Sequence, residues 1–169
     1  MRNRIKFGVL LFVVSILFGI SHQSNGITAD KILQLVNQDR ARYGLSALEL
    51  DPTLNLAAYA KAEDMSEKGY FNHVSPEGTK PWDFFKALGY DYTFAGENLA
   101  LNFSDPRDLE SSWMSSPSHR ENILSPNYSD LGLAVVSQAD RIMVVQFFGS
   151  RDNHQISFTP LSEQGLFEN

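Results

Sequence analysis

Apolar residues in the first half of the chain recur at the spacing of amphipathic helices. Residues 28–43 combine a capping threonine, an apolar stripe and a following glycine, which together predict a helix. Asp51-Pro52 is an N-cap followed by proline at the first helical position, and it predicts a second helix that ends at Gly69. Similar signals predict shorter helices over residues 79–88 and 105–115.

The pattern changes from helices to strands in the second half of the chain. Residues 92–103 read as one strand, and residues 131–136 and 142–148 read as two strands that are apolar on both faces. Such strands need cover on both sides of their sheet. Because the links between these strands are short, the sheet should be antiparallel. We therefore predict an α+β fold, a three-layer α/β/α sandwich with a central antiparallel sheet.

Residues 1–26 have a different character from the rest of the chain. Basic residues at positions 2, 4 and 6 precede a continuous apolar run over residues 7–20, and a short polar stretch follows. This is the layout of a secretory signal peptide. The run is shorter than the roughly 20 residues that span a bilayer, so we expect no permanent membrane anchor. We predict a signal peptide and linker (1–26), one domain (27–150) and a C-terminal extension (151–169).

Composition and charge narrow the possible partners. The chain is 43% hydrophobic and 20% charged, with a formal net charge of −6 and no cysteine. An acidic surface repels phosphates, so we expect no nucleic-acid partner. A protein that is secreted, or held at the cell envelope, yet lacks cysteine has neither disulfides nor thiolate metal ligands. We therefore expect a monomer held together by packing.

Three residues are candidates for a functional site: His73, Glu97 and His119. His119 follows Pro117, and we expect it on a turn between two buried anchors. Glu97 shares the period-two alternation of Leu99 and should point toward the apolar side, where a carboxylate needs a cation, a donor or a metal. The alternative for each histidine is a structural role, with its ring bonded to backbone groups of a loop.

Five short motifs, in a fixed order along the chain, resemble those of one protein family. They are Leu35-Val36-Asn37-Gln38-Asp39-Arg40-Ala41, Tyr70-Phe71-Asn72-His73, Gly96-Glu97-Asn98-Leu99-Ala100, Trp113 with Ser116 to Leu124, and Gln146-Phe147-Phe148-Gly149. In these motifs the chain resembles the CAP superfamily of cysteine-rich secretory, antigen 5 and pathogenesis-related proteins, also called SCP domains. It is most similar to the short secreted members from bacteria, over about residues 31–149.

The resemblance implies an α/β/α sandwich with a cleft that two histidines and two acidic residues line. The two histidines can hold a divalent metal, often zinc, and by motif they are His73 and His119 here. The first acid corresponds to Glu97. The second is expected about one turn past the fourth-helix tryptophan, where this chain has Ser115-Ser116. Glu121 is the acidic residue that could replace it from the other side.

Several functions fit this set of residues. A metal-bound water activated beside His73, Glu97 and His119 would give a protease-like hydrolase, with these three as candidate catalytic residues. The chain has no G-x-S-x-G or H-E-x-x-H motif, which favours binding over catalysis. We expect a polar cleft that binds a divalent metal and a small ligand or peptide. The alternatives are a cell-envelope interaction module, or a lipid or sterol site built from loop aromatics: Phe71, Phe84, Phe85, Tyr90, Tyr92 and Phe94.

Overall fold

The computed structural model describes residues 26–138 and 141–151. In chain order its elements are α1 (Ala29–Arg42), β1 (Glu49–Leu50), α2 (Pro52–Glu67), α3 (Pro81–Ala87), β2 (Phe94–Leu101), α4 (Pro106–Ser115), α5 (Pro117–Ile123), β3 (Asp130–Gln138) and β4 (Arg141–Ser150). The predicted signal peptide and nearly all of the predicted C-terminal extension lie outside the described residues.

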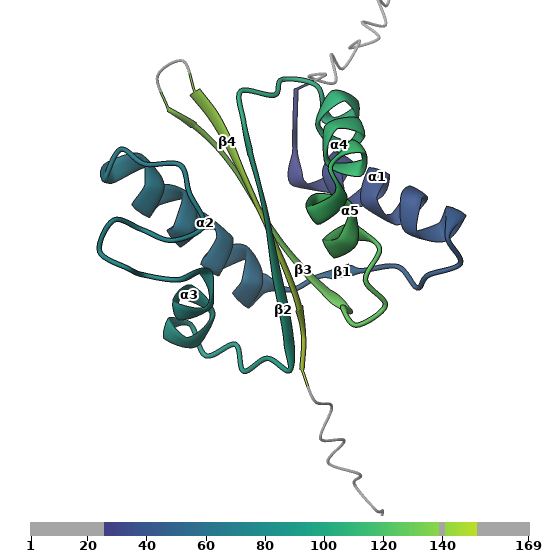
Figure 1. Ribbon diagram of the computed structural model, residues 1–169, viewed down its shortest axis with the longest axis horizontal. Coiled ribbons are helices and arrows are strands. Elements are labelled where there is room, and N and C mark those ends of the chain that lie inside the picture. Colours follow the sequence, from purple (N-terminus) through teal and green to yellow (C-terminus); the bar gives the residue numbers. More distant parts are fainter. Residues whose placement is uncertain (1–25, 139–140, 152–169) are drawn as a thin grey trace, which may run out of the picture.

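A four-stranded sheet separates two layers of helices (Figure 1). Its strand order is β1-β3-β4-β2, and β4 pairs antiparallel with both of its neighbours. Figure 1 shows α2 and α3 on one face of the sheet, and α1, α4 and α5 on the other. The predicted three-layer sandwich is therefore confirmed. The short β1 pairs parallel to β3, so the sheet is antiparallel everywhere except at that edge.

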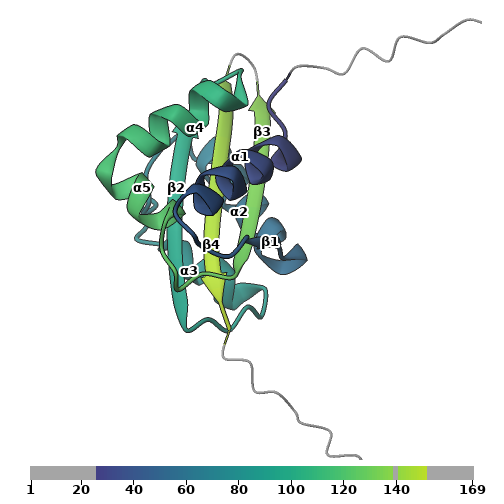
Figure 2. The same cartoon turned by 90° about the vertical axis from the view of Figure 1, so that its right-hand side faces the viewer.

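Each face of the sheet has its own hydrophobic core. Leu99 and Phe147 pack with α2 and α3, whereas Ala100 and Phe148 pack with α1, α4 and α5. Neighbouring residues of one strand thus enter opposite cores, as side-chain alternation requires. This confirms the prediction that strands apolar on both faces lie in a sheet covered on both sides (Figure 2).

Helix α2 lies very close to strand β3. Ala57, Ala58 and Ala62 are completely buried on the helix face that meets the sheet. A Cβ atom built on Gly132 of β3 would come within 2.4 Å of the backbone carbonyl of Leu54. Small residues on both elements therefore permit the close contact, which places the loop after α2 next to the sheet.

Residues 117–123 form a helix, so the prediction of a turn at His119 is wrong. Pro117 is the first residue of α5, and Ser116 before it has an extended backbone. Proline is compatible with this first position because the N–H it lacks would have no helical partner. Pro117 therefore ends α4 and begins α5 in one step, which places His119 on a helix that folds back beside β2 (Figure 2).

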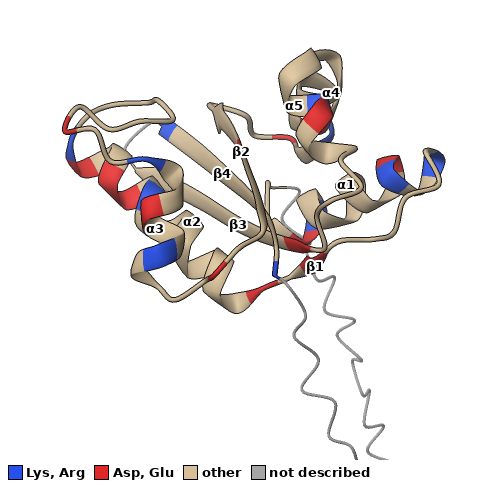
Figure 3. Ribbon diagram, turned by 60° about the horizontal axis from the view of Figure 1, so that its bottom comes forward, with Lys and Arg blue, Asp and Glu red and all other residues tan. Residues whose placement is uncertain are grey.

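Charged residues lie mainly on the helices and loops, and the three long strands are largely uncharged (Figure 3). Three charged side chains on the helices are nevertheless buried: Arg40, Lys61 and Glu110 are at most 4% exposed. Within residues 26–138 and 141–151, no helix has the length and apolar character needed to cross a membrane.

Candidate functional site

Strand β2 is an edge strand whose free side is covered by side chains. Its neighbour β4 occupies one side only. On the other side, three alternate backbone carbonyls of β2 accept side-chain hydrogen bonds. The bonds run from Tyr128 Oη to Ala95 (3.1 Å), from Asn122 Nδ2 to Glu97 (3.1 Å) and from Trp113 Nε1 to Leu99 (3.3 Å). These donors fasten α4, α5 and the segment after α5 to the strand that carries Glu97, and they close an edge that could pair with another chain.

The predicted site residues His73 and Glu97 are in direct contact. Nδ1 of His73 bonds to Oε1 of Glu97, and the His73 side chain is 56% exposed whereas that of Glu97 is 2% exposed. Burial raises the pKa of Glu97 to about 6, against the opposing effect of His73 and Lys61. Above that pH the carboxylate can only accept, so Nδ1 carries the proton and Nε2 of a neutral ring stays unprotonated.

His119 approaches the same edge of the sheet from the opposite layer. It is half-buried in α5, and its ring centre lies 6.5 Å from that of Trp113. Burial, followed by the positive charge of His73, lowers the pKa of His119. The structure therefore brings His119 within electrostatic range of His73. Among the described residues, however, no hydrogen bond joins the His119 ring to His73 or Glu97.

A network of side-chain amides holds α5 against β2. Asn98 donates to Gln146 Oε1 (3.0 Å) on β4 and to the backbone carbonyl of His119 (3.2 Å). Asn122 donates to Asn98 Oδ1 (2.9 Å) in addition to the carbonyl of Glu97. Asn98 and Asn122 thus fix the backbone that carries Glu97 and His119.

A pocket of about 380 Å³ opens beside β2. Its lining residues come from the loop after α2, the start of α3, β2 and α5: His73, Val74, Lys80, Pro81, Trp82, Ala95, Gly96, Glu97 and Asn122. Polar groups of His73, Glu97 and Asn122 meet the apolar surface of Val74 and Trp82 there. His119 does not line this pocket.

Sequence reasoning missed part of the pocket wall. The position of Trp82 in a short helix suggests a core residue, yet Trp82 is only partly buried and lines the pocket. Position 96 also requires glycine, because a Cβ there would lie 2.6 Å from Tyr128 Oη and 2.8 Å from Asn122 Oδ1. The Gly-Glu-Asn motif was a usable signal for this residue, since glycine in a strand often marks a close approach.

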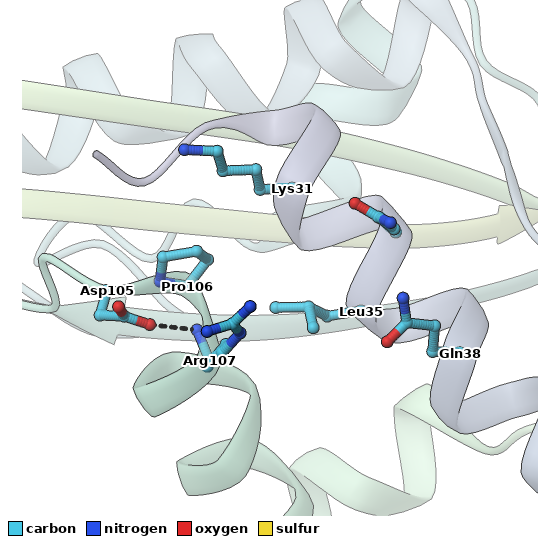
Figure 4. A pocket seen from close by; sticks show the side chains of 7 residues that line it. Lys31, Leu35, Gln38, Asp105, Pro106 and Arg107 are labelled. Carbon is cyan, nitrogen blue, oxygen red and sulfur yellow. Dashed lines mark hydrogen bonds between the residues drawn. The ribbon is translucent and has the colours of Figure 1, made fainter. Parts of the chain in front are cut away.

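A second pocket, of about 310 Å³, lies between α1 and the start of α4 (Figure 4). It is lined by Lys31, Gln34, Leu35, Gln38, Asp105, Pro106 and Arg107. Asp105 accepts a hydrogen bond from the backbone N–H of Arg107 at 2.7 Å, so it caps α4. None of the three predicted site residues lines this pocket.

The described residues offer no third protein ligand for a metal beside the two candidate histidines. Within the described part of the chain, no three His, Asp or Glu side chains come together in a way that could hold a metal ion. Ser115 occupies the end of α4 and donates to the carbonyl of Ser111, and Glu121 is exposed. The buried acid of α4 is Glu110, which interacts with Asp39. Two imidazoles would leave the remaining coordination positions of a zinc ion to water or a ligand.

The candidate lipid surface is smaller than the sequence suggested. Of its six aromatic residues, Phe85 and Tyr90 are completely buried, and Phe84 and Tyr92 pack against the core. Phe71 and Phe94 are exposed, at 40% and 46%. Lipid binding stays a prediction that would depend on these two residues.

Comparison with known proteins identifies the family. The family described as Cysteine-rich secretory protein family (CAP) matches residues 33–148. The uncharacterized protein YkwD of Bacillus subtilis is 40% identical over 119 residues, which cover 70% of this chain and 46% of YkwD. The chain thus spans less than half of that relative.

Solved structures agree with the sequence match. An extracellular SCP-domain protein of Bacillus anthracis is 28% identical with a TM-score of 0.67, and the match covers 75% of this chain and 40% of that one. An outer surface protein of Borrelia burgdorferi has the same fold, at 23% identity and a TM-score of 0.66, with 75% of this chain and 97% of that one covered. The α/β/α sandwich, the order of the motifs and these matches together show that the chain belongs to the cysteine-rich secretory protein (CAP) family.

Proposed function

We propose that the protein is an exported CAP-domain binding protein, and that the pocket beside β2 holds a small ligand or a peptide segment. The observation that carries this proposal is the composition of the pocket wall. A buried carboxylate and an exposed imidazole, already bonded to each other, face the apolar surface of Trp82 and Val74 in one pocket. Ligand sites commonly combine a mostly apolar wall with a few converging polar groups in this way.

The polar groups define the chemistry of the proposed ligand. Ionised Glu97 is an acceptor, and Nε2 of His73 is one too in the neutral ring that bonds to Glu97 through Nδ1–H, so the ligand should present an N–H or O–H donor. Trp82 and Val74 should contact an apolar ring or a branched aliphatic group. An amide, alcohol or amine that carries such a group could donate to the polar residues and pack on the apolar ones. A peptide segment could do the same.

Two tryptophans make this proposal directly testable by NMR. Trp82 lines the pocket, whereas Trp113 is 2% exposed and bonds to Leu99. The probe is a set of small primary amides, alcohols and amines that each carry one aromatic or branched aliphatic group. Binding should shift the indole N–H signal of Trp82 and leave that of Trp113 unchanged. If no member of the set moves Trp82, or if both signals move together, the pocket is not the site.

A divalent metal at His73 and His119 is a second candidate. It is favoured by the bond between Glu97 and Nδ1 of His73, since a carboxylate behind a ligating histidine orients the ring and raises its basicity. Bound zinc would supply a Lewis acid and an activated water, which is the chemistry of the hydrolase alternative. Because the described residues offer no third protein ligand, we propose metal binding only as a second candidate, after the binding of a small ligand or peptide.

Calorimetric titration of the full chain with zinc tests the metal site. His73→Ala and His119→Ala should each abolish the binding, because neither imidazole alone holds the ion. His154→Ala is the matched control, since it removes a histidine outside the described residues. Equal zinc binding in the wild type and both site variants would contradict a shared two-histidine site.

Export is supported by the sequence of residues 1–26 and by the similar structures, which include an extracellular protein and an outer surface protein. A basic N-terminal segment followed by an apolar run is the pattern of a signal peptide. Mass spectrometry of the protein recovered outside the cell should therefore show cleavage near residue 21. Recovery of the uncleaved chain from the cytoplasm alone would contradict export.

A further inference from the structure

A lysine lies completely buried beneath the candidate pocket. Lys61 is 0% exposed and occupies the face of α2 that packs against the sheet. Its Nζ donates to the backbone carbonyl of His73 at 2.9 Å and to the hydroxyl of Tyr70 at 3.0 Å. The ammonium also lies over the rings of Tyr70 and Phe84, at 4.8 and 5.6 Å from their centres. A single buried cation therefore binds both ends of the segment that leads into the pocket.

The same cation lies near two negative charges, the buried Glu97 and the partly exposed Asp64. The Tyr70 hydroxyl accepts from Lys61 and donates to Asp64 at 2.5 Å, so it links the two charged groups. Burial lowers the pKa of Lys61, and the negative charges of Glu97 and then Asp64 counteract this effect. Oε2 of Glu97 is buried and has no hydrogen-bond partner among the described residues. Lys61 is thus the cation that offsets the charge of the Glu97 carboxylate from inside the protein.

Packing alone does not account for a lysine at this position. The neighbouring members of the same helix face are Leu54, Ala57, Ala58, Ala62 and Met65, all apolar. Methionine, which is similar in volume, would fill the same space without a buried charge, and replacing buried charges by apolar residues is often neutral or stabilising. What a methionine could not supply is the bond to the His73 carbonyl and the positive charge near Glu97.

We propose that Lys61 is a positioning residue of the pocket: it pins the His73 loop from below and balances the Glu97 carboxylate, so that Glu97 holds Nδ1–H of His73 and Nε2 faces the ligand. This inference rests on the proposed role of the pocket beside β2. Lys61 itself would not contact the ligand, and it would influence binding through His73 and Glu97.

The test reads the tautomer of His73 by two-bond ¹H–¹⁵N NMR of the full chain without any ligand. The wild type should show mainly the Nδ1–H form. In Lys61→Met the ratio of Nδ1–H to Nε2–H should fall roughly tenfold, the size expected when a charge-assisted hydrogen bond weakens. Lys68→Met is the matched control, because Lys68 ends the same helix but pairs with Asp64 and Glu77 on the surface. An unchanged tautomer in folded Lys61→Met overturns the proposal.

The wild-type protein gives a second answer if Lys61→Met does not fold. Bonded to His73 and Tyr70, the Lys61 ammonium should be charged and protected from solvent exchange, whereas the ammonium of Lys68 should exchange fast. A Lys61 signal that exchanges as fast as that of Lys68 contradicts the proposal. Since neither measurement uses a ligand, a failed ligand screen would reject the proposed function and leave the result on Lys61 standing.

Discussion

Replacing Arg40 with leucine is expected to lower the free energy of unfolding by about 3–5 kcal/mol, since each buried acceptor left without its donor costs about 1–3 kcal/mol. Arg40 lies on α1 and is 1% exposed. Its guanidinium donates at 2.8 Å to each of three backbone carbonyls, those of Ser46, Ile123 and Ser125. Without the guanidinium, these carbonyls would be left without their donor in a largely buried place.

The effect should extend to the candidate site, because Arg40 holds the end of α5. Urea unfolding followed by tryptophan fluorescence measures the change. Arg42→Leu is the matched control: Arg42 lies on the same helix, its side chain is 70% exposed, and it pairs with Asp39. An exposed pair of this kind contributes less than about 1 kcal/mol. Equal losses of stability in the two variants would show that the carbonyl network around Arg40 is not important for the fold.

The opposite result is expected at Glu110, where glutamine should stabilise the protein at alkaline pH. Burial, and then the negative charge of Asp39, raises the pKa of Glu110 from 4.5 to about 8. Neither carboxyl oxygen has a hydrogen-bond partner among the described residues. Because Asp39 is also acidic, the two groups can share a hydrogen bond only while Glu110 carries a proton.

The sign of the pH dependence follows from this raised pKa. The folded protein holds the Glu110 proton more tightly than the unfolded chain, so this group favours the folded state below its ordinary pKa. The contribution is lost as the pH rises from 4.5 through about 8. Glu110→Gln removes this dependence. At about pH 8.5 the variant should exceed the wild type in stability by about 4 kcal/mol, with little difference at about pH 4.5.

Urea unfolding at both pH values checks this prediction. Glu67→Gln is the control, because Glu67 is an exposed carboxyl at the end of α2. It should leave the difference between the two pH values as in the wild type. A Glu110→Gln variant that is less stable than the wild type at the higher pH would show that the ionised carboxylate contributes a favourable interaction.

The buried charges were predictable in position but not in partner. Lys61 stands at helical spacing from Leu54, Ala58 and Met65, and Arg40 continues the buried stripe of α1, so periodicity alone places both toward the core. Their partners come from distant segments, such as Ile123, which is 83 residues from Arg40. Such contacts depend on how the layers stack, and local sequence does not encode that.

In the candidate site, too, the sequence predicts where a residue lies but not which residue it contacts. Alternation along β2 correctly placed Glu97 toward the apolar side, where it is buried. Its contact with His73, 24 residues earlier, depends on α2 packing closely on β3 and was expected only from the family resemblance. The helix at His119 was missed because the same proline both ends one helix and starts the next. β1 was missed because two residues are too few to show a period.

A comparison of two variants that each lose one negative charge tests whether Glu97 and its pocket form the binding site. The dissociation constant of the probe that shifts Trp82 most strongly is measured by NMR titration for Glu97→Gln and for Glu121→Gln. Both variants remove one negative charge, but Glu121 is exposed on α5 and does not line the pocket. Glu97→Gln should weaken binding at least about tenfold, since it removes a hydrogen bond to a charged acceptor, and Glu121→Gln should leave it unchanged. Equal affinities in the two variants would show that Glu97 is not part of the binding site and that the ligand binds at another surface.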